Sequence, residues 1–222
     1  EETGTKALKF KVGGRMSNDA DSLPGRSEKL VTLVRKTFGK EMTLYADANG
    51  SYGVEKAVAI GKLMEEHGYA FFEEPCPFDY LDETRQVADA LTMPVAGGEQ
   101  ESSQWRFRWM IANRGVDVVQ PDLDYYGGYI RATRVARMAA HAGITITPHV
   151  TGGLAYVHLL HFSSYTPNMG PHQEYKGNVP TTGHWFDPPI RLQDGALSVP
   201  TAPGAGFAEG FDEWKKGMPV NA

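Results

Sequence analysis

The chain has 222 residues and a formal net charge of −5, from 22 lysines and arginines against 27 aspartates and glutamates. Hydrophobic residues make up 41% of the chain and charged residues 22%, which excludes wholesale disorder and allows a sizeable core. The acidic balance argues against nucleic-acid binding, no apolar run approaches the roughly 20 residues that cross a bilayer, and the single Cys76 excludes an intrachain disulfide. We therefore expect a cytoplasmic protein without nucleic-acid or membrane partners.

One pattern recurs along the chain: a short run of β-forming residues, a turn and an amphipathic helical stretch. The runs predict strands at residues 7–12, 42–47, 69–73, 93–98, 116–120 and 144–148. The stretches between them predict helices at residues 27–38, 54–67, 80–91, 104–113 and 128–142. Strands that alternate with helices of this length predict parallel βαβ units.

An ionisable residue stands at or just after the end of each predicted strand. These residues are Lys11, Asp47, Glu73, Glu99, Asp122 and His149, and Glu174 follows where a further short strand could lie. In a (β/α) barrel the C-terminal ends of all strands converge on one mouth, so these side chains would face one another there. An open, doubly wound sheet would gather such residues only near its switch point. The set therefore favours an α/β fold of the TIM-barrel type.

Three of these residues, Asp47, Glu73 and Glu99, end successive strands. Ionised carboxylates that lie close together need a counter-charge. Each alone would be interpreted as a surface acid at a strand–loop junction, but three in succession favour a site for a divalent cation. Oxygen ligands without a nearby cysteine favour Mg²⁺ over zinc, with water or substrate in the remaining positions. We therefore predict that Asp47, Glu73 and Glu99 bind Mg²⁺ as the cofactor.

Short motifs surround these residues in a fixed order. They are Lys9-Phe10-Lys11, Asp47-Ala48-Asn49, Glu73-Glu74-Pro75, Gly98-Glu99, Gln120-Pro121-Asp122 and Thr147-Pro148-His149. Together, from Lys9 to about Glu174, they resemble the enolase superfamily and, within it, the mandelate racemase subgroup. The resemblance implies a modified TIM barrel with a separate α+β capping domain, a carboxylate substrate, and Mg²⁺ on the residues that match Asp47, Glu73 and Glu99.

The resemblance also predicts the organisation of the chain. The family places the lysine that Lys11 matches on the second barrel strand, whereas here it ends the first predicted strand. We therefore expect residues 1–186 to form an enolase C-terminal-domain-like barrel that lacks the first strand and the N-terminal capping domain. Residues 187–222 are expected to form an extended tail that returns toward the cap. The prolines at positions 188, 189, 200 and 203 predict irregular chain rather than a barrel helix over 187–203.

Two lysines provide the first candidate base. In a strand, Lys9 and Lys11 point to the same face and Phe10 points to the opposite one. Repulsion between two close ammonium groups, together with the charge of a metal ion, would lower the pKa of Lys11 and let it act as a base near neutral pH. A Lys-x-Lys alone would be interpreted as a solvated pair on an edge strand, but the downstream carboxylates favour the catalytic interpretation.

His149 and Asp122 form the second predicted catalytic unit. Adjacent strand ends lie close together, so Asp122 can accept a hydrogen bond from one imidazole nitrogen and raise the basicity of the other. Lys11 and His149 would then stand on opposite sides of the mouth. By the resemblance, Glu174 takes the place of an eighth-strand glutamate that hydrogen-bonds to the enolate oxygen, and its position alone leaves a surface glutamate as the alternative. Asn49 is a candidate for binding substrate hydroxyl groups.

These groups fit removal of a proton α to a carboxylate, because a cation bound to the carboxylate oxygens stabilises the developing charge. If His149 protonates a departing 3-hydroxyl, the enzyme is a hydro-lyase that converts a sugar acid to a 2-keto-3-deoxy acid, which the resemblance favours. If His149 returns a proton to the opposite face, the enzyme is a racemase or epimerase of a 2-hydroxy acid. A non-catalytic carboxylate-binding barrel is the third alternative. We expect a small-molecule carboxylate ligand and a homo-oligomeric assembly.

Overall fold

The computed structural model describes residues 4–177 and 182–211. Six strands form one parallel sheet in the order of the sequence. They are β1 (Ala7–Lys11), β2 (Thr43–Asp47), β3 (Phe71–Glu73), β4 (Val95–Gly97), β5 (Val118–Val119) and β6 (Thr145–Ile146). A parallel bridge between Ile146 and Met169 continues the sheet beyond β6. All six predicted strands are confirmed, but each is shorter than its predicted range, and β5 and β6 have two residues each where 116–120 and 144–148 are predicted.

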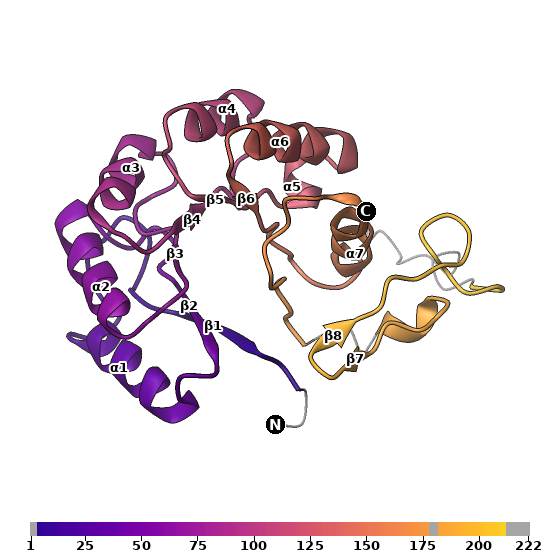
Figure 1. The fold of residues 1–222 in the computed structure, drawn as a ribbon, viewed down its shortest axis with the longest axis horizontal. Coiled ribbons are helices and arrows are strands. Elements are labelled where there is room, and N and C mark those ends of the chain that lie inside the picture. Colours follow the sequence, from indigo (N-terminus) through magenta and orange to yellow (C-terminus); the bar gives the residue numbers. More distant parts are fainter. Residues whose placement is uncertain (1–3, 178–181, 212–222) are drawn as a thin grey trace, which may run out of the picture.

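Helices connect successive strands and lie outside them. The five predicted helices are α1 (Arg26–Phe38), α2 (Val54–Glu66), α3 (Leu81–Ala90), α4 (Gln104–Ala112) and α6 (Tyr129–His141). Figure 1 shows them as an outer arc around the strands, which is the arrangement of a TIM-type barrel. Two further helices, α5 (Leu123–Tyr126) and α7 (Ala155–Tyr165), are not predicted from the sequence. Among the described residues, no helix combines the length and the apolar character that crossing a membrane requires.

Two buried clusters attach the helices to the sheet. One lies between the strands β1–β4 and the helices α1–α3, and Val31 and Phe72 are fully buried within it. The other joins β5 and β6 to the helices from α4 to α7, and Phe107 and Phe162 are fully buried there. Each cluster forms because the helices turn apolar stripes toward the sheet. A third, smaller cluster lies on the strands β2–β5 and consists of Tyr45, Phe71, Ala96 and Val118.

The register of the first three strands aligns charged side chains. Lys11 on β1 is paired with Asp47 on β2, and Asp47 is paired with Glu73 on β3. Two residues before this pair on each strand, Lys9 is paired with Tyr45. Because alternate residues of a strand point to the same face, both rows face the barrel interior. The structure thus places a row of charged residues at the C-terminal ends of these strands.

The C-terminal region is irregular, as expected for residues 187–203. A 3₁₀ turn, η1 (Gly183–Trp185), precedes this range, and a small antiparallel hairpin of β7 (Leu192–Gln193) and β8 (Ala196–Leu197) lies within it. Figure 1 shows this hairpin beside the start of β1. The contact is close, because a Cβ atom on Gly4 would lie 2.9 Å from the backbone of Asp194. Residues 212–222 of the predicted tail, and residues 1–3 and 178–181 of the predicted barrel, lie outside the described ranges.

A carboxylate from α2 fixes the turn that leads into β4. Glu65 Oε1 accepts hydrogen bonds from the backbone N–H and the hydroxyl group of Thr92, the latter at 2.7 Å, and from the Met93 N–H at 2.9 Å. Lys62 donates to Glu65 Oε2 at 2.9 Å. Burial disfavours the charge of Glu65, but these hydrogen bonds outweigh it and lower its pKa to about 2. Glu65 thereby holds the start of the strand that leads to Glu99.

We predict that Glu65→Gln lowers the free energy of unfolding by about 1 kcal/mol at neutral pH, because a neutral acceptor replaces a charged one. The folded-state pKa of Glu65, about 2, lies below its ordinary value of 4.5, so its contribution is present above about pH 4.5 and is lost as the pH falls toward 2. Urea unfolding across this pH range measures the difference. Glu66→Gln, on an exposed neighbour, is the control, and equal losses from both variants at pH 7 would contradict the prediction.

Candidate active site

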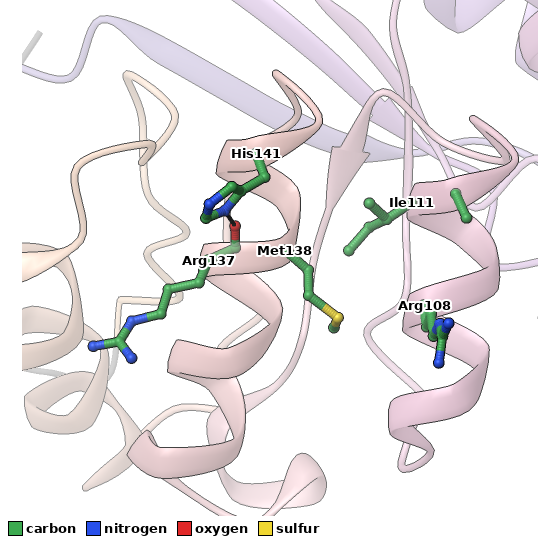
Figure 2. Close-up of a pocket in the computed structure, with 6 residues that line it drawn as sticks. Arg108, Ile111, Arg137, Met138 and His141 are labelled. Atoms are coloured by element: carbon green, nitrogen blue, oxygen red, sulfur yellow. Dashed lines mark hydrogen bonds between the residues drawn. The ribbon is translucent and has the colours of Figure 1, made fainter.

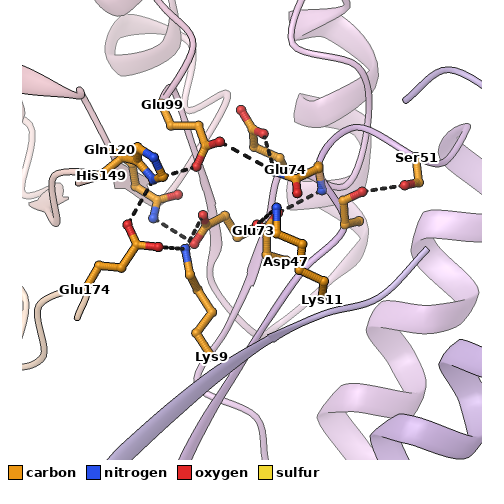
Figure 3. A network of polar contacts seen from close by, with 12 residues as sticks. Lys9, Lys11, Asp47, Ser51, Glu73, Glu74, Glu99, Gln120, His149 and Glu174 are labelled. Carbon is orange, nitrogen blue, oxygen red and sulfur yellow. Dashed lines mark hydrogen bonds and ion pairs between the residues drawn. The ribbon is translucent and has the colours of Figure 1, made fainter. Parts of the chain in front are cut away.

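The charged groups that follow successive strands gather at one end of the barrel. Glu99, Asp122 and His149 come after β4, β5 and β6, and they join the row on β1–β3. Figure 3 shows the side chains of this group turned toward one another: Lys9, Lys11, Asp47, Glu73, Glu99, His149 and Glu174. The prediction that residues far apart in sequence meet at one mouth is confirmed.

Two of the predicted metal ligands form a tight cluster with His149. Glu73, Glu99 and His149 each offer one ligand atom, and these atoms lie within 4.8 Å of one another. Glu73 is fully buried, and it accepts hydrogen bonds from Lys9 Nζ at 2.5 Å and from Gln120 Nε2 at 2.9 Å. Both carboxylate oxygens of Glu73 are thus oriented by donors, one from β1 and one from the residue that follows β5.

Asp47, the third predicted ligand, stands next to this cluster. Its Oδ2 lies 3.4 Å from Lys11 Nζ, and its Oδ1 accepts a hydrogen bond from the Asn49 N–H at 2.8 Å. The Asn49 amide reaches Glu74 Oε2 at 3.4 Å and Glu99 Oε1 at 3.5 Å. Asn49 and Glu74 both have left-handed backbone, with φ of 43° and 40°, which residues other than glycine seldom adopt. This backbone turns both side chains toward the acidic group.

A glycine brings Glu99 into the mouth. Gly98 has a φ of 113°, a backbone conformation that residues with a Cβ atom rarely adopt. A Cβ atom on Gly98 would lie only 2.8 Å from the ring of Phe107 on α4. The chain therefore needs glycine here, both to turn at the end of β4 and to let the helix pack against it.

The acidic group has the electrostatics of a cation site. Asp47, Glu73, Glu74 and Glu99 are all buried, and burial raises the pKa of Asp47, Glu73 and Glu74. At Glu74 the charges of Glu99, Asp47 and Glu73 raise the pKa further. Glu74 Oε1 is buried, and no described residue donates a hydrogen bond to it. Several buried carboxylate oxygens without cysteine fit a hard divalent cation such as Mg²⁺.

The two lysines of β1 contact different carboxylates. Lys9 Nζ lies 2.5 Å from Glu73 and 3.4 Å from Glu174. Burial disfavours the charge of Lys9, but attraction to these carboxylates outweighs it and raises its pKa. Lys11 is 69% exposed and contacts Asp47. The repulsion expected between the two ammonium groups is therefore offset at Lys9, which is a fixed cation, whereas Lys11 faces the mouth.

His149 lies between two glutamates. Its Nδ1 is 2.9 Å from Glu99 Oε2 and 2.9 Å from Glu174 Oε2. Burial disfavours the imidazolium, but hydrogen bonds to Glu174 and Glu99 outweigh it and raise the pKa of His149 to about 9. The Val150 N–H donates to Glu174 Oε2 at 3.0 Å. Glu174 is therefore placed in the mouth, where it contacts the same imidazole nitrogen of His149 as Glu99 does.

The predicted hydrogen bond between Asp122 and His149 is wrong. Asp122 instead caps α5, and its Oδ1 accepts from the N–H groups of Asp124 and Tyr125, each at 2.8 Å. The chain turns into this helix directly after Asp122, so the free N–H groups of the first turn are the nearest donors. The link that remains is electrostatic: burial raises the pKa of Asp122, while the charge of His149 acts in the opposite direction.

Two residues of the mouth were not singled out from the sequence. Gln120 binds Glu73, and Lys176 Nζ lies 3.2 Å from His149 Nε2. Gln120 could have been found, because it stands two residues before Asp122 at the end of a predicted strand. Lys176 follows Glu174 by two residues, which places both on one face of an extended segment.

A cavity of about 790 Å³ opens over this group and beside β1. A second hollow of about 380 Å³ lies on the outer surface, between α4 and α6 (Figure 2). There Ile111 and Met138 provide apolar surface beside Arg108, and the His141 Nδ1 contacts the Arg137 carbonyl oxygen at 2.7 Å. None of the described residues that line this outer hollow is acidic. The large cavity is therefore the candidate active site.

Comparison with known proteins agrees with this geometry. The chain matches the family described as enolase C-terminal domain-like over residues 1–209. Arabinonate dehydratase from Saccharolobus solfataricus is 31% identical over 217 residues, which are 96% of this chain and 56% of that protein. The crystal structure of a provisionally named racemase from Roseobacter denitrificans is 36% identical with a TM-score of 0.86, and the match covers 92% of this chain and 58% of that one.

A further crystal structure holds ligands. It is an L-talarate/galactarate dehydratase variant with Mg and L-glucarate, 28% identical with a TM-score of 0.80, and the match covers 93% of this chain and 49% of that one. The chain thus spans about half the length of the relatives that it matches. Given the matched barrel, the ordered motifs and the acidic mouth, the chain belongs to the enolase C-terminal domain-like family of the enolase superfamily.

Proposed function

We propose that this chain provides the catalytic barrel of an Mg²⁺-dependent enzyme that removes the proton α to a carboxylate and dehydrates a sugar acid. The observation that carries the proposal is the position of Lys11 and His149 on opposite sides of a buried acidic group (Figure 3). A barrel that only binds a carboxylate would need no such pair. Relatives named as arabinonate and L-talarate/galactarate dehydratases support this reaction class.

Each residue of the acidic group and its neighbours Lys9 and Asn49 has a defined role in the proposal. Asp47, Glu73 and Glu99 would hold Mg²⁺, whose charge stabilises a carboxylate as its α-proton leaves. Lys9, fixed by Glu73, adds a second positive charge in the same buried surroundings. Asn49 keeps Asp47 oriented through its backbone N–H. The carboxylate of the substrate would lie against this group.

The proposed proton transfers use one side chain on each side. The neutral amine of Lys11 takes the α-proton, and the electrons of the C–H bond move into the carboxylate to give an enediolate. In a second step these electrons form the double bond between C2 and C3 as the C3–O bond breaks. His149 donates a proton to the departing hydroxyl group, which leaves as water. The enol product tautomerises to a 2-keto-3-deoxy acid. Because Glu99 and Glu174 face the Nδ1 of His149, its Nε2 faces the cavity and is the atom that donates.

Racemisation or epimerisation of a 2-hydroxy acid is the second candidate. It uses the same residues, but His149 returns the proton to the α-carbon from the opposite face. The protein from Roseobacter denitrificans is provisionally named as a racemase, and this name supports the second candidate. Under it, each single variant of Lys11 or His149 should exchange the α-proton of only one enantiomer with solvent.

We also propose that further polypeptide completes the barrel. Among the described strands β1 pairs only with β2, and its other edge borders the large cavity. A parallel strand at this edge would close the sheet, and the capping domain and homo-oligomer expected from the sequence would cover the mouth. The relatives are about twice as long as this chain, which supports the proposal. The activity experiments are therefore designed for the full-length protein.

We predict that Glu73→Gln in the full-length protein weakens Mg²⁺ binding at least about tenfold, because even residues that only support metal ligands cost 10–100-fold when changed. Isothermal titration calorimetry with Mg²⁺ measures the change. Glu55→Gln, an exposed residue on α2, is the matched control and should bind like the wild type. Unchanged affinity in Glu73→Gln would reject this residue as a ligand.

We predict that His149→Asn abolishes dehydration of the substrate while the exchange of its α-proton with deuterium persists. Loss of a general acid typically costs about 10²–10⁴-fold in rate. Screening acid sugars identifies the substrate, and NMR of the α-position in D₂O measures exchange. His158→Asn is the control, because this histidine lies on α7 and contacts Asp124. Near-normal turnover of His149→Asn with Mg²⁺ bound would contradict the assignment.

A further inference from the structure

A third lysine lies at the mouth, beside His149. Lys176 Nζ is 3.2 Å from His149 Nε2 and 3.6 Å from Glu174 Oε1. Its side chain is 36% exposed and lines the large cavity. Its backbone N–H donates to the hydroxyl group of Tyr156, a buried residue of α7. The backbone is thus fixed, and the ammonium group reaches into the cavity from the side of His149.

Lys176 differs from the other two lysines in what it contacts. Lys9 donates to Glu73 at 2.5 Å, and Lys11 lies 3.4 Å from Asp47. Among the described residues, the nearest carboxylate oxygen to Lys176 Nζ is 3.6 Å away, which is beyond hydrogen-bond distance. An ammonium group has three N–H donors, and His149 Nε2 accepts one of them when this nitrogen is unprotonated and none when it carries the proton that it donates. Lys176 therefore retains donors for an oxygen atom in the cavity.

We propose that Lys176 is a substrate-binding residue that donates hydrogen bonds to hydroxyl oxygens of the substrate on the side of His149. The inference rests on the proposed function, in which the substrate carboxylate lies against the acidic group and His149 Nε2 faces the carbon that loses its hydroxyl. Lys176 Nζ lies 3.2 Å from His149 Nε2, so in this arrangement it contacts the oxygen on C3 of the substrate or the oxygen on C4.

This position selects the class of substrate. When a polyhydroxy acid binds, its hydroxyl oxygen can accept the hydrogen bond that Lys176 otherwise donates to water. An acid with an aromatic or alkyl group at this place would cover the ammonium group without giving it an acceptor, which is costly. Lys176 thus favours polyhydroxy carboxylates over 2-hydroxy acids with an apolar substituent, such as mandelate.

The experiment compares Lys176→Met with the wild type by calorimetry of gluconate and mandelate binding in the presence of Mg²⁺. Loss of a hydrogen bond from a charged donor should weaken gluconate binding roughly 10- to 100-fold. Mandelate binding should be unchanged or tighter. Lys176→Arg keeps a cationic donor and should retain most of the affinity for gluconate. Lys36→Met, an exposed residue of α1, is the control.

The outcomes separate this inference from the proposed function. Equal effects of Lys176→Met on the two acids, no effect on either, or no binding of either acid by the wild type would overturn the inference. A wild type that binds gluconate through Lys176 but dehydrates no acid sugar would overturn the proposed dehydration alone. On any acid sugar that is turned over, Lys176→Met should raise KM by the same factor and change kcat only a few-fold.

Discussion

The burial of several carboxylates at one end of a parallel sheet is the constraint on which the site depends. Asp47, Glu73 and Glu99 follow successive strands, so the fold itself brings like charges together. Buried charges cost free energy unless they are paired. Lys9 and His149 meet part of this requirement through contacts with Glu73 and Glu99. The remaining negative charge is what makes a divalent cation fit.

The same constraint distributes the positive groups around the mouth. Lys9 is buried against Glu73 and adopts the role of a fixed charge, whereas Lys11, two residues later on the same face, is exposed beside Asp47. Lys176 approaches from the other side and contacts His149. The three ammonium groups therefore have different surroundings. Because all three belong to lysines, the burial and the contacts of each group distinguish a charge-stabilising role from a proton-transfer or substrate-binding role.

The sequence predicts the strands and their polar ends because period and register fix which side chains point into the barrel. It does not predict partners that depend on local backbone turns. Asp122 caps α5, a helix of only four residues with too little length for a periodic signal. Helix α7 is missed because Tyr156, Leu159 and Phe162 are buried among few polar residues, so its sequence shows no clear apolar stripe. Lys176 contacts His149 through a segment that forms no strand.

The two buried clusters between the strands and the helices explain how the two sides of the site are held apart. Asp47 and Glu73 directly follow buried residues of the cluster on the strands β1–β4, and His149 directly precedes Val150 of the cluster that includes α7. The Tyr45 hydroxyl on β2 is 2.8 Å from His172 Nδ1, and this contact joins the two halves in addition to those of Gln120 with Glu73 and of Lys9 with Glu174. Because close-packed cores resist deformation, the distance between Lys11, at the end of β1, and His149, on the segment after β6, depends on how the two halves meet.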